Sequence, residues 1–142
     1  MKIFKFWMPV LIWAGMIFYF SSKPRMDSGL EQLQSGLELD FILRKGFHVF
    51  EYLIFTGLLY RAIKGSFILN QNRLLFYSIF FSILYAFLDE YHQTFVPTRT
   101  GSIYDVMVDS IGIGCSYVIL RYMFYLRGPI GILNSKSKAS KG

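Results

Sequence analysis

Apolar residues gather into four stretches that are separated by short polar connections: Phe6–Phe20, Phe47–Tyr60, Leu74–Leu88 and Ile103–Leu120. None is an uninterrupted apolar run of about 18 residues, the length that by itself indicates a membrane-spanning helix. Helices of 15 to 18 residues nevertheless cover roughly 22–27 Å, enough with flanking residues to cross a thin hydrocarbon core. Because the four stretches recur regularly and fill most of the chain, they predict an all-α integral membrane bundle of four transmembrane helices.

The longest polar connection follows the first stretch. Ser21-Ser22-Lys23-Pro24 should end the first helix, because proline disfavours a helical residue before it. An apolar stripe at helical spacing comes next, through Leu30, Leu33, Leu37 and Phe41. It fits either an amphipathic interfacial helix across the outer mouth of the bundle or a surface loop packed on its top. Farther along, Arg127-Gly128-Pro129 is expected to end the last helix.

Composition and charge support a membrane protein. Hydrophobic residues make up 54% of the 142 residues and charged residues 17%, which excludes a disordered chain or a coiled coil. In four antiparallel helices, ten basic residues with no carboxylate among them fall on one side: Lys2, Lys5, Arg61, Lys64, Arg73, Arg121, Arg127, Lys136, Lys138 and Lys141. The nine carboxylates fall on or near the other side: Asp27, Glu31, Glu38, Asp40, Glu51, Asp89, Glu90, Asp105 and Asp109.

Lysine and arginine in short loops favour the cytoplasmic side of a membrane. We therefore expect a multi-pass protein of the cell membrane with both termini in the cytoplasm. Residues 1–126 would form the membrane domain and residues 127–142 a basic, solvated tail. The net charge of +6 then reflects the orientation of the protein in the membrane. It does not indicate binding to nucleic acid, since the sequence contains no nucleic-acid motif. A cleavable signal peptide over residues 1–22 is the alternative, but bulky Tyr19-Phe20 stand before Ser21-Ser22 and no small-x-small site is evident.

Polar residues lie near the outer ends of three expected helices. Within each helix they are three or four positions apart and share a face: His48, Glu51 and Tyr52; Asp89, His92 and Gln93; Asp105 and Asp109. Antiparallel topology brings these ends to one depth, together with Glu90 and with Arg99 from the turn between the last two helices. Such groups are costly inside a membrane, so they need partners or water. The pattern predicts a polar pocket that opens to the outer leaflet, with Arg99 neutralising Asp89, Glu90 or Asp105.

A structural network that only holds the helices together is the alternative interpretation of the same residues. Two histidines with several carboxylates also suit a divalent cation, but neither the spacing of a helix-borne zinc site nor that of a di-iron site is present. We expect no bound metal and no cofactor. The single cysteine, Cys115, excludes a disulfide framework and is assigned to packing.

The motif residues resemble the VanZ-like family of small membrane proteins. The resemblance covers about Phe6–Met123 and rests on three segments: Lys45-x-x-His48-x-x-Glu51-Tyr52, Asp89-Glu90-x-His92-Gln93-x-Phe95-Val96-Pro97-x-Arg99, and Asp105 with Gly112. It implies a connection with resistance to the glycopeptide antibiotic teicoplanin. The family pattern favours asparagine at the position of Asp109, so this chain carries an additional charge there.

Two functions fit these residues. In the first, the outer pocket binds a lipid headgroup, a lipid-linked envelope precursor or a lipoglycopeptide, in contact with membrane lipids, through Lys45, His48, Glu51, Tyr52, Asp89, Glu90, His92, Gln93, Arg99, Asp105 and Asp109. In the second, the protein is an outer-leaflet hydrolase or transferase that uses Glu51, Asp89 and His92 for acid–base or metal-assisted work on a lipid-linked substrate. A transporter is disfavoured, since no broken helix or inverted repeat is visible.

Overall fold

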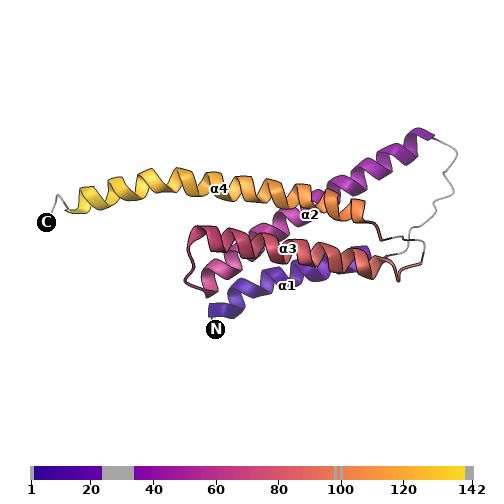
Figure 1. Ribbon diagram of the computed structural model, residues 1–142, viewed down its shortest axis with the longest axis horizontal. Coiled ribbons are helices and arrows are strands. Elements are labelled where there is room, and N and C mark those ends of the chain that lie inside the picture. The colour runs from indigo at the N-terminus through magenta and orange to yellow at the C-terminus, as the bar shows by residue number, and fades with distance from the viewer. Residues whose placement is uncertain (1, 24–33, 98, 100, 140–142) are drawn as a thin grey trace.

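The computed structural model describes residues 2–23, 34–97, 99 and 101–139, which form four helices and no strand. The helices are α1 (Lys2–Ser21), α2 (Gln34–Ser66), α3 (Gln71–Gln93) and α4 (Ile103–Ala139). Successive helices run in opposite directions, so α1 and α3 finish, and α4 begins, at one end of the bundle (Figure 1). We call this end the polar end. The all-α class predicted from the sequence is confirmed.

The central element of the fold is α2. It packs against α1, α3 and α4, whereas α1 and α4 do not contact each other in the described part of the chain. Every residue of α2 from Glu51 to Tyr60 is buried or half-buried. The other three helices instead turn many large apolar side chains outward. The segment of α2 from Glu51 to Tyr60 is therefore the part that the other helices cover.

Within the described residues, three helical segments are long and apolar enough to cross a membrane: Ile3–Ser21, Gln71–Gln93 and Ile103–Leu126. They correspond to three of the four spans expected from the sequence. The fourth, in α2, does not meet the same standard, because His48, Glu51 and Arg61 interrupt its apolar residues. Between Glu51 and Tyr60 the neighbouring helices cover α2. Side chains of α2 that contact protein in this segment do not have to be apolar in order to lie within a membrane.

The ends of the helices agree only partly with the sequence. α1 ends at Ser21, as expected, and the Ser22 hydroxyl donates to the Phe18 carbonyl at 2.6 Å. Of the predicted amphipathic stripe, Leu30 and Leu33 lie outside the described residues, and from Gln34 onward the chain runs unbroken into α2. A separate interfacial helix is thus not confirmed.

The predicted end of α4 at Arg127-Gly128-Pro129 is wrong, because the helix continues to Ala139. A proline lacks one backbone donor, but the residues around it can still form their own helical hydrogen bonds. In Figure 1, α4 extends well beyond the other helices at the end where both chain termini lie. Residues 127–139, which belong to the segment expected to be a basic, solvated tail, are therefore helical.

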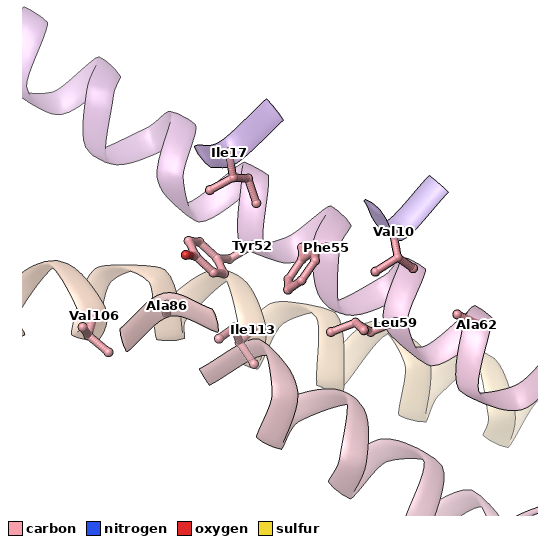
Figure 2. Packing of buried hydrophobic residues seen from close by; sticks show 9 residues of the cluster. All are labelled: Val10, Ile17, Tyr52, Phe55, Leu59, Ala62, Ala86, Val106 and Ile113. Carbon is pink, nitrogen blue, oxygen red and sulfur yellow. The ribbon is translucent and has the colours of Figure 1, made fainter. Parts of the chain in front are cut away.

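The core lies where α2 meets its three neighbours. Figure 2 shows its members: Val10 and Ile17 from α1, Tyr52, Phe55, Leu59 and Ala62 from α2, Ala86 from α3, and Val106 and Ile113 from α4. Two hydrogen bonds to main-chain oxygens fasten α1 to this core, since Trp13 Nε1 donates to the Glu51 carbonyl at 3.0 Å and the Tyr85 hydroxyl to the Ala14 carbonyl at 2.7 Å.

α2 and α4 approach each other closely at Gly112. A Cβ atom on Gly112 would lie 2.0 Å from the Val49 carbonyl oxygen and 3.1 Å from the Leu53 nitrogen. Small residues allow helices in membranes to approach in this way. The α2-facing side of α4 also carries buried Ile113 and Ser116, whereas Cys115 is exposed. The assignment of Cys115 to packing is therefore wrong, because this side chain points away from α2.

Candidate functional site

A buried carboxylate, Asp89, joins α1 to α3 at the polar end. The Ser21 hydroxyl at the end of α1 donates to Asp89 Oδ2 at 2.8 Å. Gln93, one turn after Asp89, donates through Nε2 to the same oxygen at 3.1 Å and to Ser21 Oγ at 2.6 Å. All three residues are 4% exposed or less. The triangle fixes the last turn of α3 against the last turn of α1.

Arg99 continues this network from the turn after α3. Its guanidinium donates to the carbonyl oxygens of Lys23 and Phe20, at 3.0 and 3.3 Å, and to Gln93 Oε1 at 3.3 Å. Arg99 thus reaches Asp89 through the Gln93 amide. Of the three carboxylates expected near Arg99, Asp105 forms an ion pair with Lys45 of α2.

The third expected partner, Glu90, contacts the start of α4. Its Oε2 accepts a hydrogen bond from the Ser102 backbone N–H at 2.9 Å. The neighbouring Gly101 is tightly placed, because a Cβ atom there would lie 2.3 Å from the Glu90 carbonyl oxygen. Only glycine allows the chain to pass this close to the end of α3. The contact sets where α4 begins and hence where Asp105 and Asp109 lie.

On the other side of the polar end, α2 and α4 bring a histidine between two carboxylates. His48 Nδ1 lies 3.5 Å from Glu51 Oε2 and 3.8 Å from Asp109 Oδ1. Both separations are longer than those of well-formed hydrogen bonds. The side chains of His48 and Glu51 are 24% and 20% exposed, whereas that of Asp109 is 1% exposed. Asp109 therefore lies at the inner end of this group.

Several buried polar atoms at the polar end make no hydrogen bond within the described part of the chain. They include both carboxylate oxygens of Asp109, the hydroxyl of Tyr52 and Asp89 Oδ1. Tyr52 is fully buried. Buried polar groups almost always have a partner, because leaving one without a hydrogen bond costs roughly 1–3 kcal/mol. Asp109, Tyr52 and Asp89 therefore hold the unsatisfied buried oxygen atoms of the polar end in the described part of the chain.

The structure brings most of the predicted site residues together, in two parts. Asp89, Gln93 and Arg99 join α1 to α3, while Lys45, His48, Glu51, Asp105 and Asp109 join α2 to α4. Together with Tyr52 and Glu90, we call these residues the polar layer. His92 is different: its ring packs on that of Phe18 at 4.4 Å, and its Nδ1 makes no hydrogen bond within the described residues. Asp89 and His92, which the enzyme hypothesis uses for acid–base work, are joined by no hydrogen bond in the described part of the chain.

Two residues of the site were not predicted from the sequence, Ser21 and Ser102. Ser21 belongs to the segment expected only to end α1, and Ser102 to the turn before α4. A serine that closes an apolar helix and faces a predicted polar cluster is a signal that could have indicated Ser21. Within the described residues, no group of three or more His, Cys, Asp or Glu is arranged to hold a metal ion.

The Ser21 bridge gives a first testable prediction. Ser21→Ala removes the donor to Asp89 and the acceptor for Gln93, so it should lower the free energy of unfolding by about 1–3 kcal/mol. Ser22→Ala is the matched control, because Ser22 is adjacent and bonds only within its own helix in the described structure. Thermal unfolding of the purified variants in detergent measures both. Equal midpoints for the two variants would contradict a bridging role for Ser21.

Comparison with known proteins identifies the family. A family model described as VanZ/LLP1 matches residues 6–125, from the first turns of α1 to the end of the apolar part of α4. No curated protein and no solved structure matches the chain. Since the matched segment includes the whole polar layer and the three helices that are apolar enough to cross a membrane, the chain belongs to the VanZ/LLP1 family and is a membrane protein.

Proposed function

We propose that the protein crosses the cell membrane four times, with both termini in the cytoplasm, and that its polar layer binds or modifies a lipid-like or cell-envelope ligand at the outer leaflet. Binding of this kind would lower the sensitivity of the cell to lipoglycopeptide antibiotics such as teicoplanin. The choice of antibiotic class is what the resemblance to the VanZ-like family implies. The location follows from the distribution of charge.

Charge supports the proposed orientation. Arg61, Lys64, Arg73 and Arg121 are exposed at the end of the bundle opposite the polar layer. Both chain termini lie toward that same end (Figure 1). Because lysine and arginine near the ends of spans favour the cytoplasm, the polar layer would face outward. The central position of α2 supports a fourth span, since a helix covered on three sides can carry His48 and Glu51 across a membrane.

The observation that carries the proposal is the burial of polar groups without partners. Asp109 is 1% exposed and both of its carboxylate oxygens make no hydrogen bond within the described residues. Ionisable residues inside a membrane are costly, and those that persist commonly serve a ligand or ion pathway. A network that only held the helices together would satisfy its own atoms, as Ser21, Asp89 Oδ2 and Gln93 do.

The second candidate is an outer-leaflet enzyme that uses Glu51, Asp89 and His92. The contact of Glu51 with His48, at 3.5 Å, favours it, because a carboxylate beside an imidazole is a common acid–base arrangement. The other two residues favour binding instead. His92 packs on Phe18, and Asp89 Oδ2 already accepts hydrogen bonds from Ser21 and Gln93. We therefore place binding first.

Antibiotic susceptibility tests the proposal. Expression of the chain in a susceptible Gram-positive host should lower sensitivity to a lipid-anchored glycopeptide such as teicoplanin more than to vancomycin. A protein whose site lies at the outer leaflet acts on what enters that leaflet, and an acyl chain contributes about 0.8 kcal/mol per buried CH₂ to such entry. Equal protection against both drugs would indicate a general change of the envelope. No protection by correctly inserted protein would contradict the proposal.

A further inference from the structure

We propose that the group recognised by the polar layer is a primary ammonium, bound between Asp109 and Glu51 beside the Tyr52 hydroxyl. This inference deepens the proposed function, because it rests on the same site and names the chemistry of its ligand. It applies to an amphiphile with an amine headgroup and equally to a soluble amine. The three groups of residues that support it are the carboxylates, the buried acceptors and the partly exposed side chains at the entrance.

The described side chains of the polar layer include more carboxyl groups than permanently cationic groups. Five carboxylates, from Glu51, Asp89, Glu90, Asp105 and Asp109, face two permanent cations, those of Lys45 and Arg99. Lys45 is in an ion pair with Asp105, and Arg99 donates to Gln93 and to two backbone carbonyls. A positively charged ligand would reduce this excess, whereas a phosphate or carboxylate headgroup would increase it.

The buried oxygen atoms of the site favour a ligand that donates hydrogen bonds. Both oxygens of Asp109 and the hydroxyl of Tyr52 make no hydrogen bond within the described residues, although Asp109 is 1% exposed and Tyr52 is fully buried. A primary ammonium carries three N–H donors and no acceptor, so it can satisfy several such oxygens at once. A quaternary ammonium has no N–H group and is usually bound by aromatic rings instead. The unsatisfied oxygens therefore favour the primary amine.

The two carboxyl groups approach the same nitrogen atom from two helices. Glu51 Oε2 and Asp109 Oδ1 lie 3.5 and 3.8 Å from the same atom, His48 Nδ1. These separations are longer than the roughly 2.7–2.9 Å of a charge-assisted hydrogen bond, so the histidine does not satisfy either oxygen. The side chains of His48 and Glu51 are about a quarter exposed or less and form the open side of the group. An ammonium entering past them would meet Asp109 at the inner end.

The test uses the full chain in nonionic detergent micelles and measures its thermal unfolding midpoint. Dodecylammonium should raise the midpoint, whereas dodecyltrimethylammonium at the same mole fraction should not. In Asp109→Asn, which keeps the shape of the side chain and removes its charge, the half-saturating mole fraction of dodecylammonium should rise at least about tenfold. The control is Ser22→Ala, because Ser22 lies outside the polar layer and its hydroxyl donates to the Phe18 carbonyl of α1 in the described structure. It should respond as the wild type does.

Propylammonium distinguishes the two sources of the ligand. Stabilisation by dodecylammonium alone supports a lipid headgroup, and equal stabilisation by both amines supports a soluble amine. The proposal is overturned if neither amine stabilises the wild type, if Asp109→Asn responds like the wild type, or if the quaternary ammonium acts as well as the primary one. If one of these results is obtained while the protein still protects against teicoplanin, the ligand is not a primary ammonium, but the proposed function is not contradicted.

Discussion

Replacing Gly112 with leucine is expected to separate α4 from α2 and to lower the stability of the fold by about 3 kcal/mol or more. A Cβ atom at this position would lie 2.0 Å from the Val49 carbonyl oxygen and 2.9 Å from its carbon. Both are backbone atoms inside a helix, so neither can rotate away as the end of a side chain would. Relief requires the whole of α4 to move, and α4 carries Asp105 and Asp109 toward Lys45 and His48 of α2.

The matched control for Gly112→Leu is Gly114→Leu, two residues farther along the same helix. Gly114 is exposed, and a Cβ atom there would meet nothing within 4 Å. The two variants share the same gain in apolar volume and the same change in helix propensity, so only the contact with α2 differs. The two variants are compared in detergent by their thermal unfolding midpoints and by their size-exclusion profiles. If Gly112→Leu unfolds at the temperature of Gly114→Leu, the close crossing of α2 and α4 is not as described.

The arrangement of the helices was predictable to the extent that it follows from local pattern. Helical spacing placed His48 and Glu51 on one face, and the structure puts their polar atoms 3.5 Å apart. It also placed Asp89 and Gln93 on one face, and α3 indeed continues to Gln93 with a hydrogen bond between them. These contacts depend on the geometry of a single helix, which a sequence specifies directly.

The central position of α2 was not predictable in the same way. Hydropathy ranks a helix by its own side chains, whereas burial depends on how many neighbours surround it. The sequence of α2 is interrupted by charge, and the structure accommodates this by covering the helix on three sides. The sequence also does not specify which side chains of different helices form ion pairs. The polar layer contains two cations, Arg99 and Lys45, and only the crossing of α2 with α4 decides that Lys45 forms the ion pair with Asp105.

Neutral substitutions of the outer carboxylates should reduce protection against teicoplanin in a graded manner. In a binding site, Glu51→Gln or Asp89→Asn removes one charged partner, worth about 1.5–3 kcal/mol, which corresponds to about 10- to 150-fold in affinity. Asp89→Asn keeps an oxygen that can accept from Ser21, so the bridge to α1 should survive. Weaker binding is overcome by mass action, and higher expression of either variant should therefore recover part of the protection.

An enzyme would respond differently, and the same strains distinguish the two candidates. Loss of a general acid or base costs about 10²- to 10⁴-fold in rate, which an achievable increase in expression does not restore. The measurement is the inhibitory concentration of teicoplanin as a function of the amount of inserted protein, for wild type, Glu51→Gln and Asp89→Asn. Ser22→Ala serves as the control, because its exposed hydroxyl bonds only within α1 in the described structure. A complete loss at every expression level, with the protein correctly inserted, would contradict binding and make catalysis by Glu51 and Asp89 the function to pursue.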